Sequence, residues 1–167
     1  LLIHFLHAIH PCLKDQVRDI TFLNPVHSMP RYKQIIFDLF FKDQDDRFYI
    51  IELQNAIEPY FHRRAMYYIS RVLSTQLMPG QDYKQMRSVS LIGLLNYPLS
   101  ELRDCSSTAI KTDLFALELF SIYNVNDLSQ NSSRSQKWLY LIKYFHLLKE
   151  IPKALAKDPE FSLAVKV

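Results

Sequence analysis

The sequence predicts the α/β (α+β) fold class, with one mixed sheet flanked by helices. Two aromatic and β-branched runs, residues 34–41 and 48–54, surround an acidic turn and indicate a β-hairpin. A helical apolar period follows at residues 58–77, and the expected order along the chain is α-β-β-β-α-β-β-α. The 167 residues, 49% hydrophobic and 22% charged, have the composition of a globular protein, so we expect a single domain over residues 1–167.

The first two elements are a helix and a strand. Residues 1–10 place apolar side chains on one helical face, and Pro11 ends this helix. Residues 17–23 are expected to form a strand that ends at Asn24 and Pro25. A loop rich in proline and polar residues then leads to the hairpin.

The turn between the two hairpin strands sets their register. Its residues 43–46 are Asp, Gln, Asp and Asp. We expect a three-residue loop, residues 44–46, with Asp46 in the left-handed region that aspartate tolerates. Asp43 then pairs with Arg47, and the numbers of paired residues sum to 90 along the whole hairpin.

This register decides whether two carboxylates meet. Asp38 then lies directly opposite Glu52, and their side chains share one face of the sheet, together with Gln54 two residues further on. A four-residue loop would instead place Asp38 opposite Ile51 and turn Glu52 to the other face.

Asp38 and Glu52 interrupt apolar strands, where a carboxylate costs several kcal/mol unless it is paired or holds a metal. Two carboxylates so close would repel each other, and Mg²⁺ with oxygen ligands would relieve that repulsion. The alternative is a structural network of ion pairs with Arg31, Arg63 or Arg64. The residues alone leave both interpretations open.

The later elements alternate between helix and strand. In order, we expect a helix over residues 58–77 that Pro79 and Gly80 end, strands over 88–97 and 113–122, a turn-rich stretch over 124–133, and a helix that carries Trp138 and ends before Pro152.

Several classes of protein are excluded or disfavoured. Gly80 and Gly93 are the only glycines and cannot build a phosphate-cradling loop, so we expect no nucleotide cofactor. No apolar run is long enough for a membrane span, and residues 1–9 lack the features of a signal peptide. Cys12 and Cys105 form no CxxC unit, which favours a reducing, cytoplasmic location. Because the chain does not begin with methionine, we expect an upstream segment to be missing.

The charge alternates along the chain. Residues 61–90 carry five basic groups and one acidic group, whereas residues 1–60 carry six basic and eight acidic groups. An acidic site flanked by basic surfaces is typical of proteins that bind a polyanion, although ordinary solvated helices produce similar swings. The candidate phosphate contacts in the basic stretch are Arg63, Arg64, Arg71, Lys84 and Arg87, and Tyr67 is a candidate for stacking on a base.

Three motifs occur together in this order: Asp38-x₁₃-Glu52-x-Gln54, Phe61-x₂-Arg64-Ala65-x-Tyr67-Tyr68 and Gln76-Leu77-x₂-Gly80-x-Asp82-Tyr83. Their combination resembles the PD-(D/E)xK nuclease superfamily and, more closely, the Rpn-like recombination-promoting nucleases and transposases. The resemblance implies a restriction-endonuclease-like αβββαβ core and a metal-dependent DNA endonuclease linked to transposition or recombination.

The same resemblance implies the roles of individual residues. Asp38 and Glu52 would bind Mg²⁺, with Mn²⁺ as a substitute, and the backbone carbonyl of Leu53 would be a third ligand. Gln54 stands where the superfamily motif has Lys, and would orient water or phosphate by hydrogen bonding. DNA would be the partner, and a homodimer is compatible with this prediction.

The chain departs from the family pattern at its start. Relatives have a longer first helical segment, often with another carboxylate, and this chain has no acid before Asp15. The alternative prediction is therefore a catalytically inactive, truncated remnant that binds nucleic acid or associates with itself.

Overall fold

The computed structural model describes every residue of the chain except 15, 149, 151, 157 and 165–167. The chain divides into two compact units, one formed by Ile20–Ser121 and the other by Leu1–Asp19 together with Ile122–Val167. The first unit contains the sheets, and the described regular structure of the second is helical. The single domain over residues 1–167 stays a prediction.

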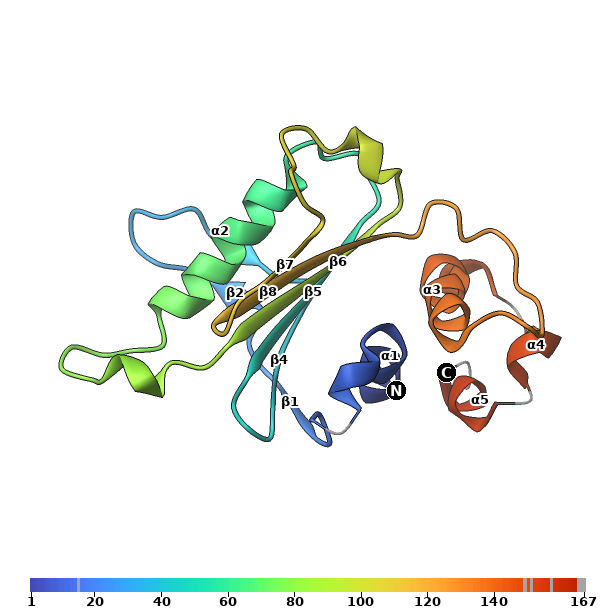
Figure 1. Ribbon diagram of the computed structural model, residues 1–167, viewed down its shortest axis with the longest axis horizontal. Coiled ribbons are helices and arrows are strands. Elements are labelled where there is room, and N and C mark those ends of the chain that lie inside the picture. The colour runs from blue at the N-terminus through green and yellow to red at the C-terminus, as the bar shows by residue number, and fades with distance from the viewer. Residues whose placement is uncertain (15, 149, 151, 157, 165–167) are drawn as a thin grey trace. The chain divides into compact units, whose positions relative to one another are not determined.

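A six-stranded mixed sheet forms the centre of the first unit, which confirms the predicted fold class (Figure 1). Strands β1, β4 and β5 are antiparallel neighbours, β5 runs parallel to β6 and β6 to β8, and β7 is antiparallel to β8. In spatial order the strands are β1 (Ile20–Phe22), β4 (Leu39–Asp43), β5 (Phe48–Gln54), β6 (Val89–Leu95), β8 (Phe115–Ser121) and β7 (Ala109–Lys111). A second sheet pairs β2 (Val26–His27) with β3 (Ile35–Ile36).

The β4–β5 hairpin has the predicted register. Phe40 pairs with Ile50 and Lys42 pairs with Phe48. The turn closes as expected, because the Asp43 amide donates to the Arg47 carbonyl at 3.0 Å and Asp46 adopts a φ of 60°. The three-residue loop thus places the following residues of both strands as the sequence predicts.

Asp43 anchors this turn from a buried position. Its carboxylate accepts hydrogen bonds from the amides of Asp45 and Arg47, from Nε of Arg47 at 2.6 Å and from the Tyr49 hydroxyl at 3.1 Å. Burial is the largest cause, and the Asp43 charge the next, of a raised pKa of Tyr49, so its hydroxyl remains a donor.

Helix α2 (Phe61–Ser74) connects β5 to β6 across one face of the sheet (Figure 1). Its buried apolar residues recur at every third or fourth position and are Phe61, Ala65, Ile69 and Val72. At Gly93 of β6, a Cβ atom would lie 2.7 Å from the Phe61 ring. The missing side chain of Gly93 therefore lets the start of α2 approach the sheet.

The helical unit packs α1 (Leu2–Ile9) with α3 (Arg134–Tyr144). The Phe5 ring meets the edge of Trp138 at a centroid distance of 6.1 Å, and a capping box at Ser133 begins α3. The remaining short elements are α4 (Lys153–Ala156), α5 (Pro159–Ala164) and 3₁₀ turns at Pro11–Leu13, Tyr83–Gln85, Leu99–Glu101 and Phe145–Leu147.

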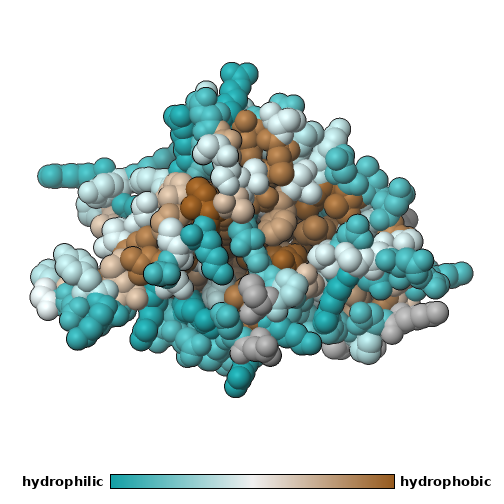
Figure 2. Space-filling model, viewed as in Figure 1, coloured by the Kyte–Doolittle hydropathy of each residue, from teal (hydrophilic) through white to brown (hydrophobic). Residues whose placement is uncertain are grey.

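None of the helices in the described part of the chain is both long and apolar enough to cross a bilayer. Large apolar side chains nevertheless reach the surface, among them Phe22, Tyr32 and Ile36. Figure 2 shows such apolar surface between hydrophilic side chains on the face in view. Exposed apolar residues of this kind are ordinary on protein surfaces.

The sequence prediction was wrong about the first hairpin strand, which is not continuous over residues 34–41. The strand is interrupted between β3 and β4, because the Phe37 amide donates to the Pro25 carbonyl at 3.0 Å and does not continue the β4–β5 ladder. The last predicted helix is also shorter, since α3 ends at Tyr144 in a 3₁₀ turn. Strands β2 and β7, and the pairing of β2 with β3, were not predicted.

We predict that Asp43→Asn lowers the free energy of unfolding by about 3 kcal/mol. An amide can present only one oxygen to four donors, and its NH₂ group would face Arg47. Urea unfolding measures the loss. Asp45→Asn is the control, because its carboxylate also bonds Arg47 but is 62% exposed, so it should cost less than about 1 kcal/mol. Equal losses for the two variants would contradict the anchoring role.

Candidate active site

Asp38 and Glu52 lie side by side at the end of the β4–β5 hairpin. The Asp38 amide donates to Oε1 of Glu52 at 3.2 Å, and the Leu53 amide donates to Oδ2 of Asp38 at 2.7 Å. Because side chains alternate along strands, both acids belong to the face that carries Phe40 and Ile50 beneath α2. Each carboxylate thus accepts a hydrogen bond from a backbone amide of the opposite segment, at the point where the β4–β5 ladder ends.

The predicted opposition of the two acids is therefore observed, with one correction. Asp38 does not lie in a strand but in the bend between β3 and β4. The bend exposes Asp38, whereas Glu52 within β5 is only 6% exposed. One carboxylate is consequently buried and the other faces solvent.

The electrostatics of the pair favour a cation. Burial, and then the Asp38 charge, raise the pKa of Glu52 from 4.5 to about 7, while the Asp38 amide and Arg64 partly oppose this rise. Burial and the Glu52 charge also raise the pKa of Tyr68, a residue of α2 that lies close to the two acids. Negative charge is therefore in excess around Glu52.

Gln54 and Arg64 form a second pair beside the acids. Nη2 of Arg64 donates to Oε1 of Gln54 at 2.5 Å, and Nε2 of Gln54 donates to the Ala56 carbonyl at 2.8 Å. The Arg64 guanidinium lies 4.7 Å from the Phe61 ring centre, and its Nε is buried without a partner. These contacts fix the orientation of the Gln54 amide. They also hold the positive charge of the Arg64 guanidinium close to Glu52.

The residues present fit a hard divalent cation. Within the described residues, no group of three or more His, Cys, Asp or Glu side chains surrounds one point, so two carboxylates are the acidic donors here. Mg²⁺ is commonly held by one or two carboxylates, with water and substrate oxygens completing its shell. The excess negative charge at Glu52 is what such a cation would neutralise.

The alternative explanation for the two acids, a structural network of ion pairs, is not observed among the described residues. In the described part of the chain, neither Asp38 nor Glu52 lies within 4 Å of a basic nitrogen. Arg63 instead pairs with Asp104 at 3.1 Å on the surface. The two acids are therefore not explained by internal neutralisation.

The predicted DNA contacts are spread along the α2 side of the sheet unit. Arg63, Lys84 and Arg87 are exposed, and Tyr67 is half-buried. Lys84 pairs with Asp82 at 3.1 Å. The structure brings only Arg64 of this set to the acids.

Arg71 requires a correction, because the helical pattern places it on the polar side of α2 and the structure buries it. It is 6% exposed, and the Tyr32 ring lies 4.8 Å from its guanidinium carbon. Tyr32 belongs to the loop between β2 and β3, and this small sheet was not predicted. The unforeseen loop covers what the periodicity predicts to be a solvated residue.

Sequence reasoning missed two residues of the site. Tyr68 lies beside the acids, and its position four residues after Arg64 is the signal that could have found it. Gly93 pairs with Glu52 in the β5–β6 ladder and leaves room for Phe61. A glycine inside an apolar strand signals such a close approach.

Comparison with known proteins identifies the family. The family model described as PD-(D/E)XK nuclease family transposase matches residues 1–167. None of the curated proteins and none of the solved structures compared with the chain matches it. Because the family model spans the whole sequence, the chain belongs to this family.

We predict that Glu52→Gln stabilises the metal-free protein at pH 8. The pKa of Glu52 is near 7 in the folded protein and 4.5 when unperturbed, so ionised Glu52 disfavours the fold, and stability falls as the pH rises from 4.5 through 7. The difference amounts to about 3 kcal/mol above pH 7 and vanishes below pH 4.5. The amide of the Glu52→Gln variant keeps an oxygen that can accept from the Asp38 amide.

The measurement is urea unfolding in EDTA at pH 5 and pH 8. Glu101→Gln is the control, because it removes an exposed carboxylate elsewhere in the same unit and should leave stability nearly unchanged at both pH values. A Glu52→Gln variant less stable than the unaltered protein at pH 8 would contradict the proposed excess of negative charge.

Proposed function

We propose that this member of the PD-(D/E)XK nuclease family is a metal-dependent DNA endonuclease that acts in transposition or recombination in the cytoplasm. The observation that carries the proposal is the buried Glu52 carboxylate held against the exposed Asp38 carboxylate, without a basic partner within the described residues. A homodimer would bring two such sites to the two strands of a duplex.

Asp38, Glu52 and the backbone carbonyl of Leu53 would hold the cation, Mg²⁺ or Mn²⁺ in its place. When bound, the cation supplies Lewis-acid stabilisation of the charge that develops on the phosphate oxygens. The Leu53 carbonyl would be a suitable metal ligand because the backbone of this residue lies next to Asp38. The Leu53 amide donates to Oδ2 of Asp38 at 2.7 Å. Asp38 thus fixes the local backbone as well as contributing a carboxylate.

Gln54 and Arg64 orient the substrate in this proposal. Gln54 carries no charge, so it acts by presenting its amide to a water molecule or a phosphate oxygen. Arg64 uses one of its N–H groups on Gln54 and retains others for a phosphate. The positive charge that Lys supplies in the superfamily motif would come here from Arg64 and the cation.

The exposed basic residues extend the proposed contact surface for DNA. Arg63, Lys84 and Arg87 would contact backbone phosphates, and Tyr67 would stack on a base. Such contacts position the substrate without reading its sequence.

We predict that the protein cleaves DNA with Mg²⁺ or Mn²⁺ and is inactive in EDTA. Asp38→Asn and Glu52→Gln should each lower the cleavage rate by about 10³-fold, because each removes a ligand of a cation that contributes several kcal/mol. Rates are measured on labelled duplex and single-stranded DNA. Glu101→Gln should cleave at the unaltered rate.

Cleavage that persists in both site variants would come from a contaminating nuclease. A folded, metal-binding protein that binds DNA but never cleaves it would overturn the enzymatic proposal and favour the inactive, DNA-binding remnant. Thermal unfolding in the presence of Mn²⁺ checks folding and metal binding separately from activity.

We also predict that Arg64→Ala weakens DNA binding in EDTA and flattens the dependence of log K on log salt by about 0.9 unit. A residue with a purely structural role would instead lower the melting temperature and leave the slope unchanged. Fluorescence anisotropy at several salt concentrations measures the slope. Arg18→Ala is the control, since Arg18 is exposed in the acidic stretch 1–60 and should not change the slope.

A further inference from the structure

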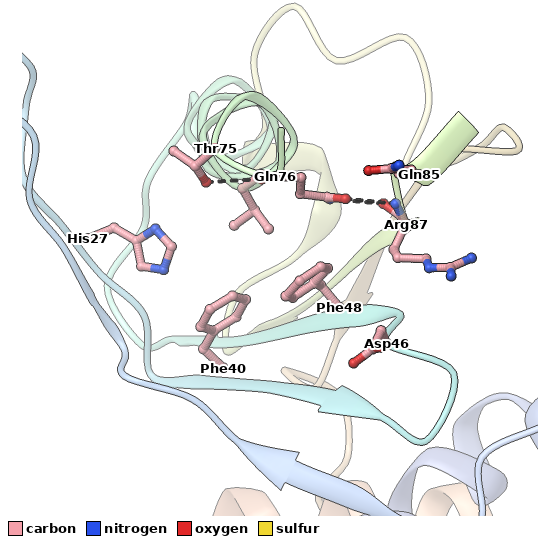
Figure 3. A pocket seen from close by; sticks show the side chains of 9 residues that line it. His27, Phe40, Asp46, Phe48, Thr75, Gln76, Gln85 and Arg87 are labelled. Atoms are coloured by element: carbon pink, nitrogen blue, oxygen red, sulfur yellow. Dashed lines mark hydrogen bonds between the residues drawn. The ribbon is translucent and has the colours of Figure 1, made fainter. Parts of the chain in front are cut away.

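A groove of about 600 Å³ lies beside the C-terminal end of α2, and neither of the two acids lines it (Figure 3). Its volume is in the range of pockets for small organic ligands. His27 stands on one side and Gln85 and Arg87 on the other, with Phe40 and Phe48 below α2. The groove is therefore built from α2 and three further segments: the β2–β3 sheet, the hairpin and the loop before β6.

The floor of the groove is aromatic. The rings of Phe40 and Phe48 stack with 5.9 Å between their centres and an angle of 14°. His27 meets the edge of Phe40 at 5.0 Å, and burial and the Arg71 charge lower its pKa, so the imidazole is neutral at neutral pH. Planar apolar surface of this kind suits an aromatic ring system.

A buried cation lies next to this floor. Nε and Nη2 of Arg71 have no hydrogen-bond partner, and no acid of the described residues pairs with it. Arg71 acts on His27 electrostatically and precedes Thr75, a residue of the groove wall, by one helical turn. An always-charged guanidinium buried without a counter-ion indicates that an anion from outside completes the site.

The Tyr32 ring lies next to the Arg71 guanidinium. Its ring centre lies 4.8 Å from the guanidinium carbon, the residue is itself 61% exposed, and both neighbours, Arg31 and Lys33, are basic and exposed. A small displacement of the Tyr32 ring would uncover the unpartnered N–H groups. The surrounding positive charge favours a negatively charged ligand there.

The distribution of charge orients a ligand in the groove. Asp46, on the rim near Arg87, pairs with Lys42, so its negative charge is already offset by basic groups at that side of the groove. The buried Arg71 guanidinium has no acid paired with it among the described residues, so an anionic group is favoured at the Arg71 side. The exposed amide of Gln85 is a hydrogen-bonding group on the side of Arg87.

We propose that this groove binds one nucleotide, with its unpaired base on the Phe40, Phe48 and His27 surface and its phosphate at Arg71. Its assignment to a nucleotide of the DNA strand rests on the proposed nuclease function. Phe48 precedes Glu52 by four residues of the same strand, about 13 Å, so the groove would hold a nucleotide near the cleavage site, not the reacting one. Base stacking on aromatic rings is the usual way in which proteins hold unpaired nucleotides.

The test measures binding of deoxyadenosine 5′-monophosphate by NMR titration in EDTA. Arg71→Met should weaken the nucleotide about tenfold, or about 1.4 kcal/mol, and leave deoxyadenosine unaffected. Phe48→Leu should weaken both ligands about fivefold. Tyr32→Ala should tighten nucleotide binding at least about twofold, because the cover no longer has to move, and this gain cannot result from misfolding. Arg103→Ala is the control and should change nothing, because Arg103 is exposed in the same unit and does not line the groove.

Several outcomes would overturn the proposal. They are the absence of nucleotide binding up to about 10 mM, unchanged affinity in Arg71→Met, weaker binding in Tyr32→Ala, and deoxyribose 5-phosphate that binds as tightly as the nucleotide. A short single-stranded oligonucleotide should compete for the groove, and failure to compete would exclude DNA as the source of the nucleotide. Asp38→Asn should bind the nucleotide normally, so loss of cleavage and loss of this site are distinguishable.

Discussion

The exchange of backbone hydrogen bonds for side-chain hydrogen bonds at the end of the β4–β5 hairpin is the constraint on which the site depends. The Asp38 amide donates to Glu52 and the Leu53 amide donates to Asp38. Each carboxylate therefore satisfies a backbone N–H group of the opposite segment. This geometry requires the register that the turn at Asp43 and Asp46 sets. A shift by one residue would turn Glu52 to the opposite face and separate the acids.

The same arrangement explains how α2 reaches the site. Glu52 pairs with Gly93, whose missing side chain admits the Phe61 ring at the start of the helix. Arg64 then lies one turn along α2, stacked on Phe61 and bonded to Gln54. The carboxylates, the amide and the guanidinium are thus positioned by β5, by the bend directly before β4 and by one helix. A strand and helix scaffold holds functional groups more precisely than loops do.

The sequence was sufficient where short-range rules decide the structure. The hairpin register followed from the tolerance of Asp46 for positive φ, and the burial of one side of α2 followed from the helical period. It was insufficient where distant segments decide. The burial of Arg71 depends on Tyr32, almost forty residues earlier, in a loop with no periodic pattern. The break before Asp38 depends on the Pro25 carbonyl, which no local rule identifies as the partner of Phe37.

Glu52 and Arg71 are both about 6% exposed and carry opposite charges on the same side of the sheet, yet they do not neutralise each other. Arg71 follows Arg64 by seven residues, which is about 10 Å along a helix, so the buried cation lies far from the carboxylate. Such unpaired charges cost stability and persist where binding compensates them. In the function and the groove proposed above, a nucleic acid together with a divalent cation would supply both missing partners: the cation would neutralise Glu52, and a phosphate would neutralise Arg71. Under that proposal, the two separated charges would be complementary to one extended, metal-associated polyanion rather than to each other.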